Sequence, residues 1–385
     1  MKLHIYHRHG AHAGIFTALL CLLGIPVCWA VEAGTSTSTP NLLAHDNLVA
    51  WEAAPYDTKK RTPEERAQMF VRLGIKHYAY LSSTNLWDIK DDVNVSHFDV
   101  DAEIEAMQKY HIDILAWYFW INSDHPADVP VVLQTLEAFK RHHIHPQIWV
   151  ANSSEYLLDG LRKAVPKGSP VPLTEPEFNK LSSEERKKLE AAWLAAEERN
   201  YHPATREAQH RRVEREAARI KELVDLAAPY DCKVYLYNHR GWFGIEENEL
   251  AIIHRLEELG VPDMRMVYNF AHSRDARHDD AKNFPELWAK IKPHVAAVNV
   301  VGLNSTDHEG TPVYPSQGDL ELGMMRTIQE SGWVGPVGAL VLWKQDDTEV
   351  VLRNSIKGID WLAAELKQPG SGGPRPLPVK SASEQ

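Results

Sequence analysis

Cysteine is scarce in this chain of 385 residues, with three in total. Two of them, Cys21 and Cys28, lie in or beside the apolar N-terminal stretch, and neither lies in a lipid-attachment sequence. Without that stretch Cys232 remains alone, and one cysteine cannot form a disulfide within the chain. We therefore expect the hydrophobic core to stabilise the fold, with Cys232 as a buried apolar side chain.

Positive charge is also in deficit, with 42 Lys and Arg against 53 Asp and Glu, a net charge of −11. Nucleic-acid binding depends on clustered cations that contact phosphates. The acidic balance therefore argues against a nucleic-acid partner.

Long apolar runs are absent except for Ala13–Val27. This run follows the positive residues Lys2 and Arg8, is short for a membrane span and precedes small residues that end at Ala30. The pattern predicts a signal peptide over residues 1–30, cleaved after Ala30, and a secreted or periplasmic protein with no stable membrane anchor. An uncleaved anchor is the alternative.

Eight apolar segments alternate with helical patterns, and no two of them resemble a hairpin. We predict strands at 47–51, 76–81, 112–120 and 147–151, and further strands that begin at 233, 264, 295 and 335. The simplest arrangement is an α/β fold, a closed (β/α)8 TIM barrel of parallel strands. An open doubly wound sheet is the alternative, but the glycine-rich phosphate turn typical of that fold is missing.

The domain limits follow from composition. Residues 31–46 are predicted to be a linker, 47–367 the barrel, and 368–385 a disordered Gly/Pro/Ser-rich tail. A proline-rich loop and a charged helix, about 166–202, are predicted to form an insertion between strands 4 and 5. Its capping box at Ser182–Glu185 marks the start of that helix.

Polar residues follow three of the predicted strands, at Tyr237-Asn238-His239, Asn269 to His272, and Asn299. Parallel barrels place their active sites at the carboxyl ends of the strands. These residues are therefore expected to share one pocket.

These strand ends, together with Gln317-Gly-Asp319, resemble the xylose isomerase-like TIM barrels, also described as sugar phosphate isomerases and epimerases. Trp51 with Pro55–Asp57 and Arg61–Arg66 resembles a secreted branch of that group. The resemblance covers about residues 47–366. It implies a sugar-processing barrel with a divalent metal at its mouth.

The metal ligands that the resemblance implies are a glutamate, an aspartate, a histidine and a glutamate at the ends of strands five to eight. Tyr237, Asn269, Asn299 and Leu340 occupy those positions here. Hard divalent ions need anionic oxygen ligands, so we expect no metal site and no cofactor. The two glutamates that normally share acid and base work are missing as well.

Two histidines are the best candidates for proton transfer, because imidazole both takes and gives protons near neutral pH. The predicted catalytic residues are His239 and His272, with Asn269 and Asn299 stabilising an oxyanion. The predicted substrate-binding residues are Tyr237, Asn238, Trp242 and Glu52. Trp242 could stack on a sugar ring, and Glu52 is the acid closest to a strand end. For each, the alternative is a structural role at the barrel rim or, for Glu52, a solvated loop acid.

These residues favour an exported carbohydrate-processing protein whose partner is a small sugar or keto-sugar. We expect a sugar isomerase, epimerase or keto-sugar lyase that acts at a carbon next to a carbonyl. The alternative is a non-catalytic sugar-binding barrel that has lost its metal-dependent chemistry. A metal-dependent phosphodiesterase or endonuclease of a related barrel is a third possibility, which the missing ligands and acidic charge disfavour.

Overall fold

A computed structural model describes residues 41–54, 56–81, 99–121, 123–151, 182, 184, 185, 188, 205–239, 241–276, 283–306, 311–341 and 346–379. The predicted signal peptide and most of the predicted insertion lie outside these residues. Within the described part, residues from Pro40 onward belong to one compact unit.

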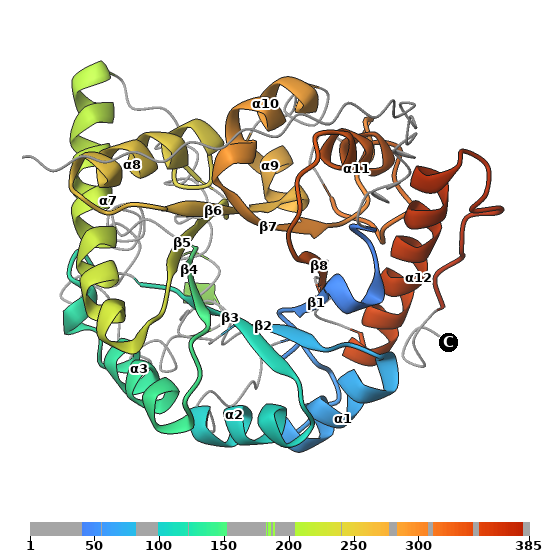
Figure 1. Ribbon diagram of the computed structural model, residues 1–385, viewed down its shortest axis with the longest axis horizontal. Helices are drawn as coiled ribbons and strands as arrows, with labels where there is room; N and C mark the ends of the chain where they lie inside the picture. The colour runs from blue at the N-terminus through green and yellow to red at the C-terminus, as the bar shows by residue number, and fades with distance from the viewer. Residues whose placement is uncertain are drawn as a thin grey trace, which may run out of the picture. The chain divides into compact units, whose positions relative to one another are not determined.

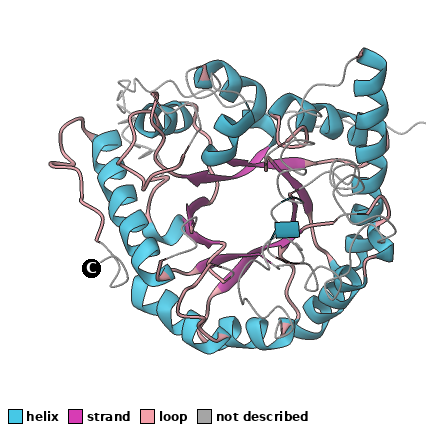
Figure 2. Cartoon of the chain, turned by 180° about the vertical axis from the view of Figure 1, so that it is seen from behind, coloured by secondary structure: helices cyan, strands magenta, loops and turns pink. Residues whose placement is uncertain are grey.

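Eight parallel strands close into a barrel in sequence order, each hydrogen-bonded to the next and β8 to β1. Figure 1 shows the ring of strands enclosed by helices, and Figure 2 shows the same ring from behind. The strands are β1 Leu48–Trp51, β2 His77–Leu81, β3 Asp113–Phe119, β4 Gln147–Val150, β5 Val234–Tyr237, β6 Arg265–Asn269, β7 Val295–Val300 and β8 Val337–Leu340. The TIM-barrel prediction is confirmed.

The helices that surround the strands are α1 Pro63–Leu73, α2 Val100–Lys109, α3 Pro130–His142, α7 Arg206–Ala227, α8 Glu246–Glu258, α9 Phe270–Ala276, α10 Phe284–Ile291, α11 Glu321–Glu330 and α12 Thr348–Lys367. Short 3-10 turns are η1 His45–Asn47, η3 Pro126–Asp128, η4 Ala228–Tyr230 and η5 Lys292–His294. None of these described helices is long and apolar enough to cross a membrane.

Local sequence signals account for the helix ends. Thr62 and Glu65 form a capping box around Pro63, and Gly74 ends α1 in the left-handed conformation at φ 71°. The predicted box at Ser182–Glu185 is present too, because the Ser182 backbone N–H donates to Glu185 over 2.8 Å and the Glu185 N–H donates to Ser182 Oγ.

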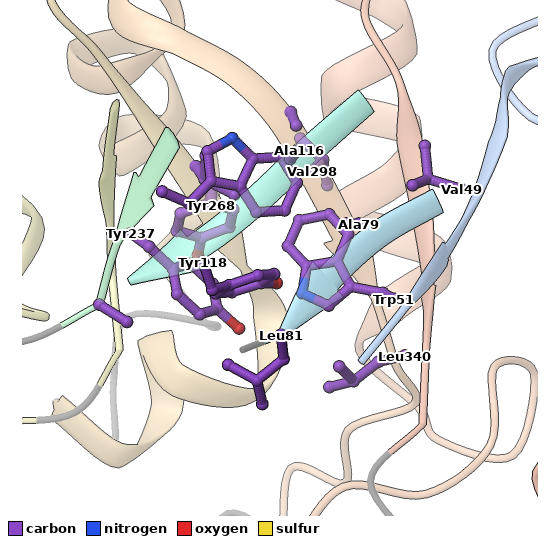
Figure 3. Packing of buried hydrophobic residues seen from close by; sticks show 14 of the residues in the cluster. Val49, Trp51, Ala79, Leu81, Ala116, Tyr118, Tyr237, Tyr268, Val298 and Leu340 are labelled. Atoms are coloured by element: carbon purple, nitrogen blue, oxygen red, sulfur yellow. The ribbon is translucent and has the colours of Figure 1, made fainter. Parts of the chain in front are cut away.

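Four fully buried aromatic rings fill one side of the barrel interior. They are Trp51 on β1, Tyr118 on β3, Trp149 on β4 and Tyr237 on β5. The centroids of Trp51 and Trp149 lie 4.4 Å apart, and those of Tyr118 and Tyr237 lie 5.2 Å apart. Figure 3 shows Trp51, Tyr118 and Tyr237 pointing toward one another inside the barrel.

Two predicted boundaries were wrong. The predicted linker includes Leu42 and Leu43, which are buried in the core before β1. The predicted disordered tail is ordered from residue 368 to residue 379. This segment lies along α12 (Figure 1). There the Val379 N–H donates to Asn354 Oδ1, and Arg375 donates to the Gly318 carbonyl over 2.8 Å. Gly and Pro composition indicated flexibility, but these hydrogen bonds hold the segment; residues 380–385 lie outside the described part.

Candidate functional site

Two imidazole rings meet where β5 and β6 end. His239 follows β5, His272 lies in α9 directly after β6, and their ring centroids are 4.1 Å apart. His272 is 5% exposed, while His239 is half-buried with its ring packed edge-on against Trp120 at 4.6 Å. The structure therefore brings together the two residues predicted to move protons.

Tyr237 lies beside both imidazoles, with ring centroids 5.8 Å from His239 and 5.6 Å from His272. Its hydroxyl accepts a hydrogen bond of 2.6 Å from Asn269 Nδ2. The Asn269 amide cannot be turned round, because its Oδ1 accepts from the Ala271 N–H over 3.0 Å. The chain of hydrogen bonds therefore runs from the backbone to Asn269 to Tyr237, and it fixes the position of the Tyr237 hydroxyl.

Asn269 also accounts for the start of α9. By accepting from the Ala271 N–H, it caps the helix that carries His272. The sequence did not indicate this short helix. The side-chain carbonyl and one N–H of Asn269, the predicted oxyanion donor, are therefore used to position His272 and Tyr237.

Glu52 and Tyr118 extend the site toward β1 and β3. Glu52 follows β1 in a left-handed conformation, φ 59°, and is 6% exposed. A glutamate in this conformation carries backbone strain, which proteins retain mainly at functional positions. Burial, followed by the neighbouring Tyr237 and Glu52, raises the pKa of Tyr118 well above 10.0. Both tyrosines and Glu52 thus belong to one buried polar group.

Asn299 lies on β7, two strands from β1 around the barrel. It is paired in register with Asn269 on β6 and with Gly338 on β8, and it is fully buried. Neither its Oδ1 nor its Nδ2 has a hydrogen-bond partner among the residues that the structure describes. A buried amide without a partner is unusual in a folded protein and marks a place where a polar molecule can bind.

Asn238 and Trp242, two of the predicted substrate-binding residues, are hydrogen-bonded to other protein groups. Asn238 Oδ1 accepts from the Asn269 N–H over 2.7 Å, and its Nδ2 donates to the Asn269 carbonyl, so Asn238 fastens β5 to β6. This is the structural alternative that the sequence left open. Trp242 is 1% exposed, its Nε1 donates to Gln209, and Arg212 lies 4.5 Å over its ring. These contacts place Trp242 against α7 and do not favour sugar stacking.

Sequence reasoning missed Tyr118 and Trp120 at the site. Side chains alternate along β3, and Trp117 packs outward, against Phe139 of α3 at 5.3 Å. The same alternation turns Tyr118 and Trp120 to the inner side. The period-two pattern of β3 was thus the signal that could have found both.

A pair of buried glutamates lies behind the end of β5. Glu246 and Glu249, one turn apart on α8, are both fully buried, and Glu246 accepts from Asn238 Nδ2 over 3.5 Å. Burial and the neighbouring Glu246 raise the pKa of Glu249 well above 4.5. Glu249 therefore keeps its proton to a higher pH in the folded protein than in the unfolded chain.

This shift predicts how stability changes with pH. Above pH 4.5 the unfolded chain releases the Glu249 proton while the folded protein retains it, so the free energy of unfolding falls as the pH rises toward the folded-state pKa. We expect this contribution to reach about 1.4 kcal/mol per pH unit. Urea unfolding of Glu249→Gln between pH 4.5 and 8 should show a shallower fall than the parent, whereas Glu330→Gln, an exposed acid on α11, should not. Equal slopes in all three proteins would contradict the assignment.

The strand ends do not fit a divalent metal. Tyr237 and Asn269 are hydrogen-bonded to each other, Asn299 is a neutral amide, and Leu340 has no donor atom. Across the described part of the chain, no three His, Cys, Asp or Glu residues gather in a way that could hold a metal ion. Hard cations require anionic oxygens, so the chemistry of this site is derived from its protein groups.

Several solved structures share this fold. The IOLI protein with a bound zinc atom is 13% identical, with a TM-score of 0.52 over 83% of this chain and 99% of that one. A xylose isomerase domain-containing protein from Salmonella typhimurium is 13% identical, with a TM-score of 0.52 over 84% and 98%. The probable 3-DHS dehydratase AsbF from Bacillus anthracis, involved in petrobactin synthesis, is 10% identical, with a TM-score of 0.50 over 82% and 98%.

The similarity to xylose isomerase-like TIM barrels is thus confirmed for the fold. No protein-family description and no curated protein sequence matches the chain. The residues around His239 and His272 are therefore the basis for a functional proposal.

Proposed function

We propose that this protein is a carbohydrate-processing enzyme that transfers a proton at a sugar carbon next to a carbonyl, without a metal. The observation that carries the proposal is the pair of imidazoles, 4.1 Å apart, beside the Tyr237 hydroxyl that Asn269 holds in place. The described fold neighbours include a xylose isomerase domain protein and a dehydratase, which agrees with this class of chemistry. The reaction is an isomerisation, an epimerisation or an elimination from a keto-sugar.

The residues divide the work as follows. His272 or His239 takes the proton from the carbon. The C–H electron pair forms a new carbon–carbon double bond, and the carbonyl π pair moves to oxygen to give an enediolate. Tyr237 donates its proton-bearing hydroxyl to that oxygen, the role that a metal has in the relatives. The imidazolium then returns the proton to the same or the neighbouring carbon. Asn269 acts by holding Tyr237 and α9 in place.

This mechanism departs from the prediction at one residue. The oxyanion donor assigned to Asn269 becomes Tyr237, because Asn269 is hydrogen-bonded to Tyr237 and Ala271. Glu52 keeps its predicted role in substrate binding, because it is buried near Tyr118 and can accept a hydrogen bond from a sugar hydroxyl.

The test is proton exchange in D₂O. A panel of aldoses, ketoses and keto-sugars is incubated with protein that has been dialysed against EDTA, and NMR follows the carbon-bound protons. We expect deuterium to enter next to the carbonyl of the substrate. Sugar binding without exchange would favour the non-catalytic sugar-binding barrel instead. An isomer formed without exchange would point to hydride transfer and would rule out the histidine mechanism.

We also propose that the protein acts outside the cytoplasm, on the basis of Lys2, Arg8 and the apolar run that follows them. The mature chain is expected to begin at Val31, which takes the net charge from −11 to −13 by removing the two cations. Mass spectrometry of the exported protein measures its first residue. A mature chain that still carries Met1 would contradict cleavage.

A further inference from the structure

We infer that Arg61 is a positioning residue, which holds the loop after β1 against the start of α12 and thereby keeps Glu52 in the site. This loop comprises residues 52–61, of which residue 55 lies outside the described part. The inference rests on the proposed function only for the task of Glu52, which is to accept a sugar hydroxyl. It gives a role to Asp57 and Arg61, which the mechanism above does not use.

Arg61 bridges carboxylates from two distant parts of the chain. Its Nη1 lies 2.7 Å from Asp57 Oδ1 in the same loop, and its Nη2 lies 2.8 Å from Oδ1 of Asp347, the residue that caps α12. Glu349 of α12 lies 3.4 Å from the same Nη2. The side chain of Arg61 is 12% exposed and that of Asp57 is 2% exposed, so water screens this bridge less than an ion pair on the surface.

Two hydrogen bonds link the same loop to the segment that begins α12. Thr348 Oγ1 donates to the Ala53 carbonyl over 3.4 Å, and the Thr58 N–H donates to the Asp346 carbonyl over 3.4 Å. Both bonds are long and neutral, whereas the bonds of Arg61 are short and charged. Arg61 is therefore the strongest of these links between the loop and α12.

Glu52 lies between two fixed points of the backbone. Its N–H donates to the Ala79 carbonyl of β2 over 3.2 Å, and the carbonyl of the next residue, Ala53, accepts the bond from α12. Between these points Glu52 has φ 59°, which is unfavourable for any residue except glycine and persists only where the surroundings impose it. In a continued strand its side chain would point to the opposite face from that of Trp51. The left-handed turn ends this alternation, and Glu52 interacts with Tyr118.

A double-mutant cycle on thermal unfolding tests the inference without any ligand. Glu52→Gly should raise the melting temperature of the wild-type protein by about 2 °C, because glycine adopts φ 59° without strain. In Arg61→Gln the loop is free to relax, so Glu52→Gly should give no rise. Arg255→Gln is the matched control, in which the rise should persist, because Arg255 on α8 also bridges two carboxylates, Glu214 at 2.9 Å and Glu258 at 2.7 Å.

The same rise in all three backgrounds would overturn the inference, because Arg61 would then have no influence on the conformation of Glu52. The absence of a rise in the wild-type protein would overturn it as well. If Arg61→Gln does not fold, Arg61→Lys takes its place in the cycle with the same expected outcome. Lysine keeps the charge, but a single ammonium does not reproduce the planar fork that bridges two carboxylates.

Sugar affinity separates this inference from the proposed function. In calorimetry with the panel of aldoses, ketoses and keto-sugars, Glu52→Gln and Arg61→Gln should each weaken binding by about tenfold. The double variant should bind no more weakly than Glu52→Gln alone, because both changes remove the same contact, whereas additive losses would overturn the positioning role. If no sugar in the panel binds, the proposed function fails, and the melting temperatures still decide whether Arg61 holds Glu52 in place.

Discussion

Replacing His272 by alanine should lower turnover by about 10²–10⁴-fold, the usual contribution of a general base, with a much smaller change in sugar affinity. His272 is 5% exposed, and its ring lies 5.6 Å from that of Tyr237, whose hydroxyl Asn269 holds in place. Removing the imidazole takes away the proton acceptor and leaves the hydroxyl contacts of the sugar in place. Steady-state rates and calorimetric affinities on the same sugar measure the two effects separately.

His239→Ala should show a comparable loss if the two imidazoles share the acid and base work, and a much smaller loss if His239 only orients its neighbour. His210→Ala provides the control, because His210 is an exposed histidine on α7. Normal turnover in both His239→Ala and His272→Ala would rule out the mechanism. A loss of affinity as large as the loss of turnover would assign the histidines to binding.

Replacing Gly358 by alanine should destabilise the fold by about 3 kcal/mol, the upper part of the range for overpacked positions. Gly358 lies in α12, and a Cβ there would stand 2.0 Å from the Pro315 carbonyl oxygen and 2.7 Å from its carbon. Both are backbone atoms, so the clash cannot be relieved by turning a side chain. The helix must move away from the loop that joins β7 to α11.

Gly323→Ala is the matched control, because Gly323 lies in α11 with nothing within 4 Å of the added Cβ. This variant should be more stable than the parent by roughly 0.5–1 kcal/mol, since alanine favours the helix. Urea unfolding of the two variants measures the contrast. Equal stability of both would show that α12 and the Pro315 loop can separate without cost.

Local patterns in the sequence were sufficient for the barrel. Apolar strands such as Ile112–Trp120, the capping box at Thr62 and the stop at Gly74 each depend on neighbouring residues, and their alternation leaves a closed parallel barrel as the simplest arrangement. The same reasoning placed Tyr237, His239 and His272 near one another, because the carboxyl ends of parallel strands meet at one face.

Contacts between distant segments decided what each polar residue does. Asn238, Asn269 and Asn299 look alike at the strand ends, yet the first fastens two strands, the second caps α9 and holds Tyr237, and the third has no partner among the described residues. Composition also misled at the C-terminus, where Arg375 and Asn354 hold a segment that its Gly and Pro content predicted to be disordered. Apart from the cap on Ala271, these hydrogen-bond partners lie 25 to 57 residues away along the chain, so only the tertiary structure could distinguish these roles.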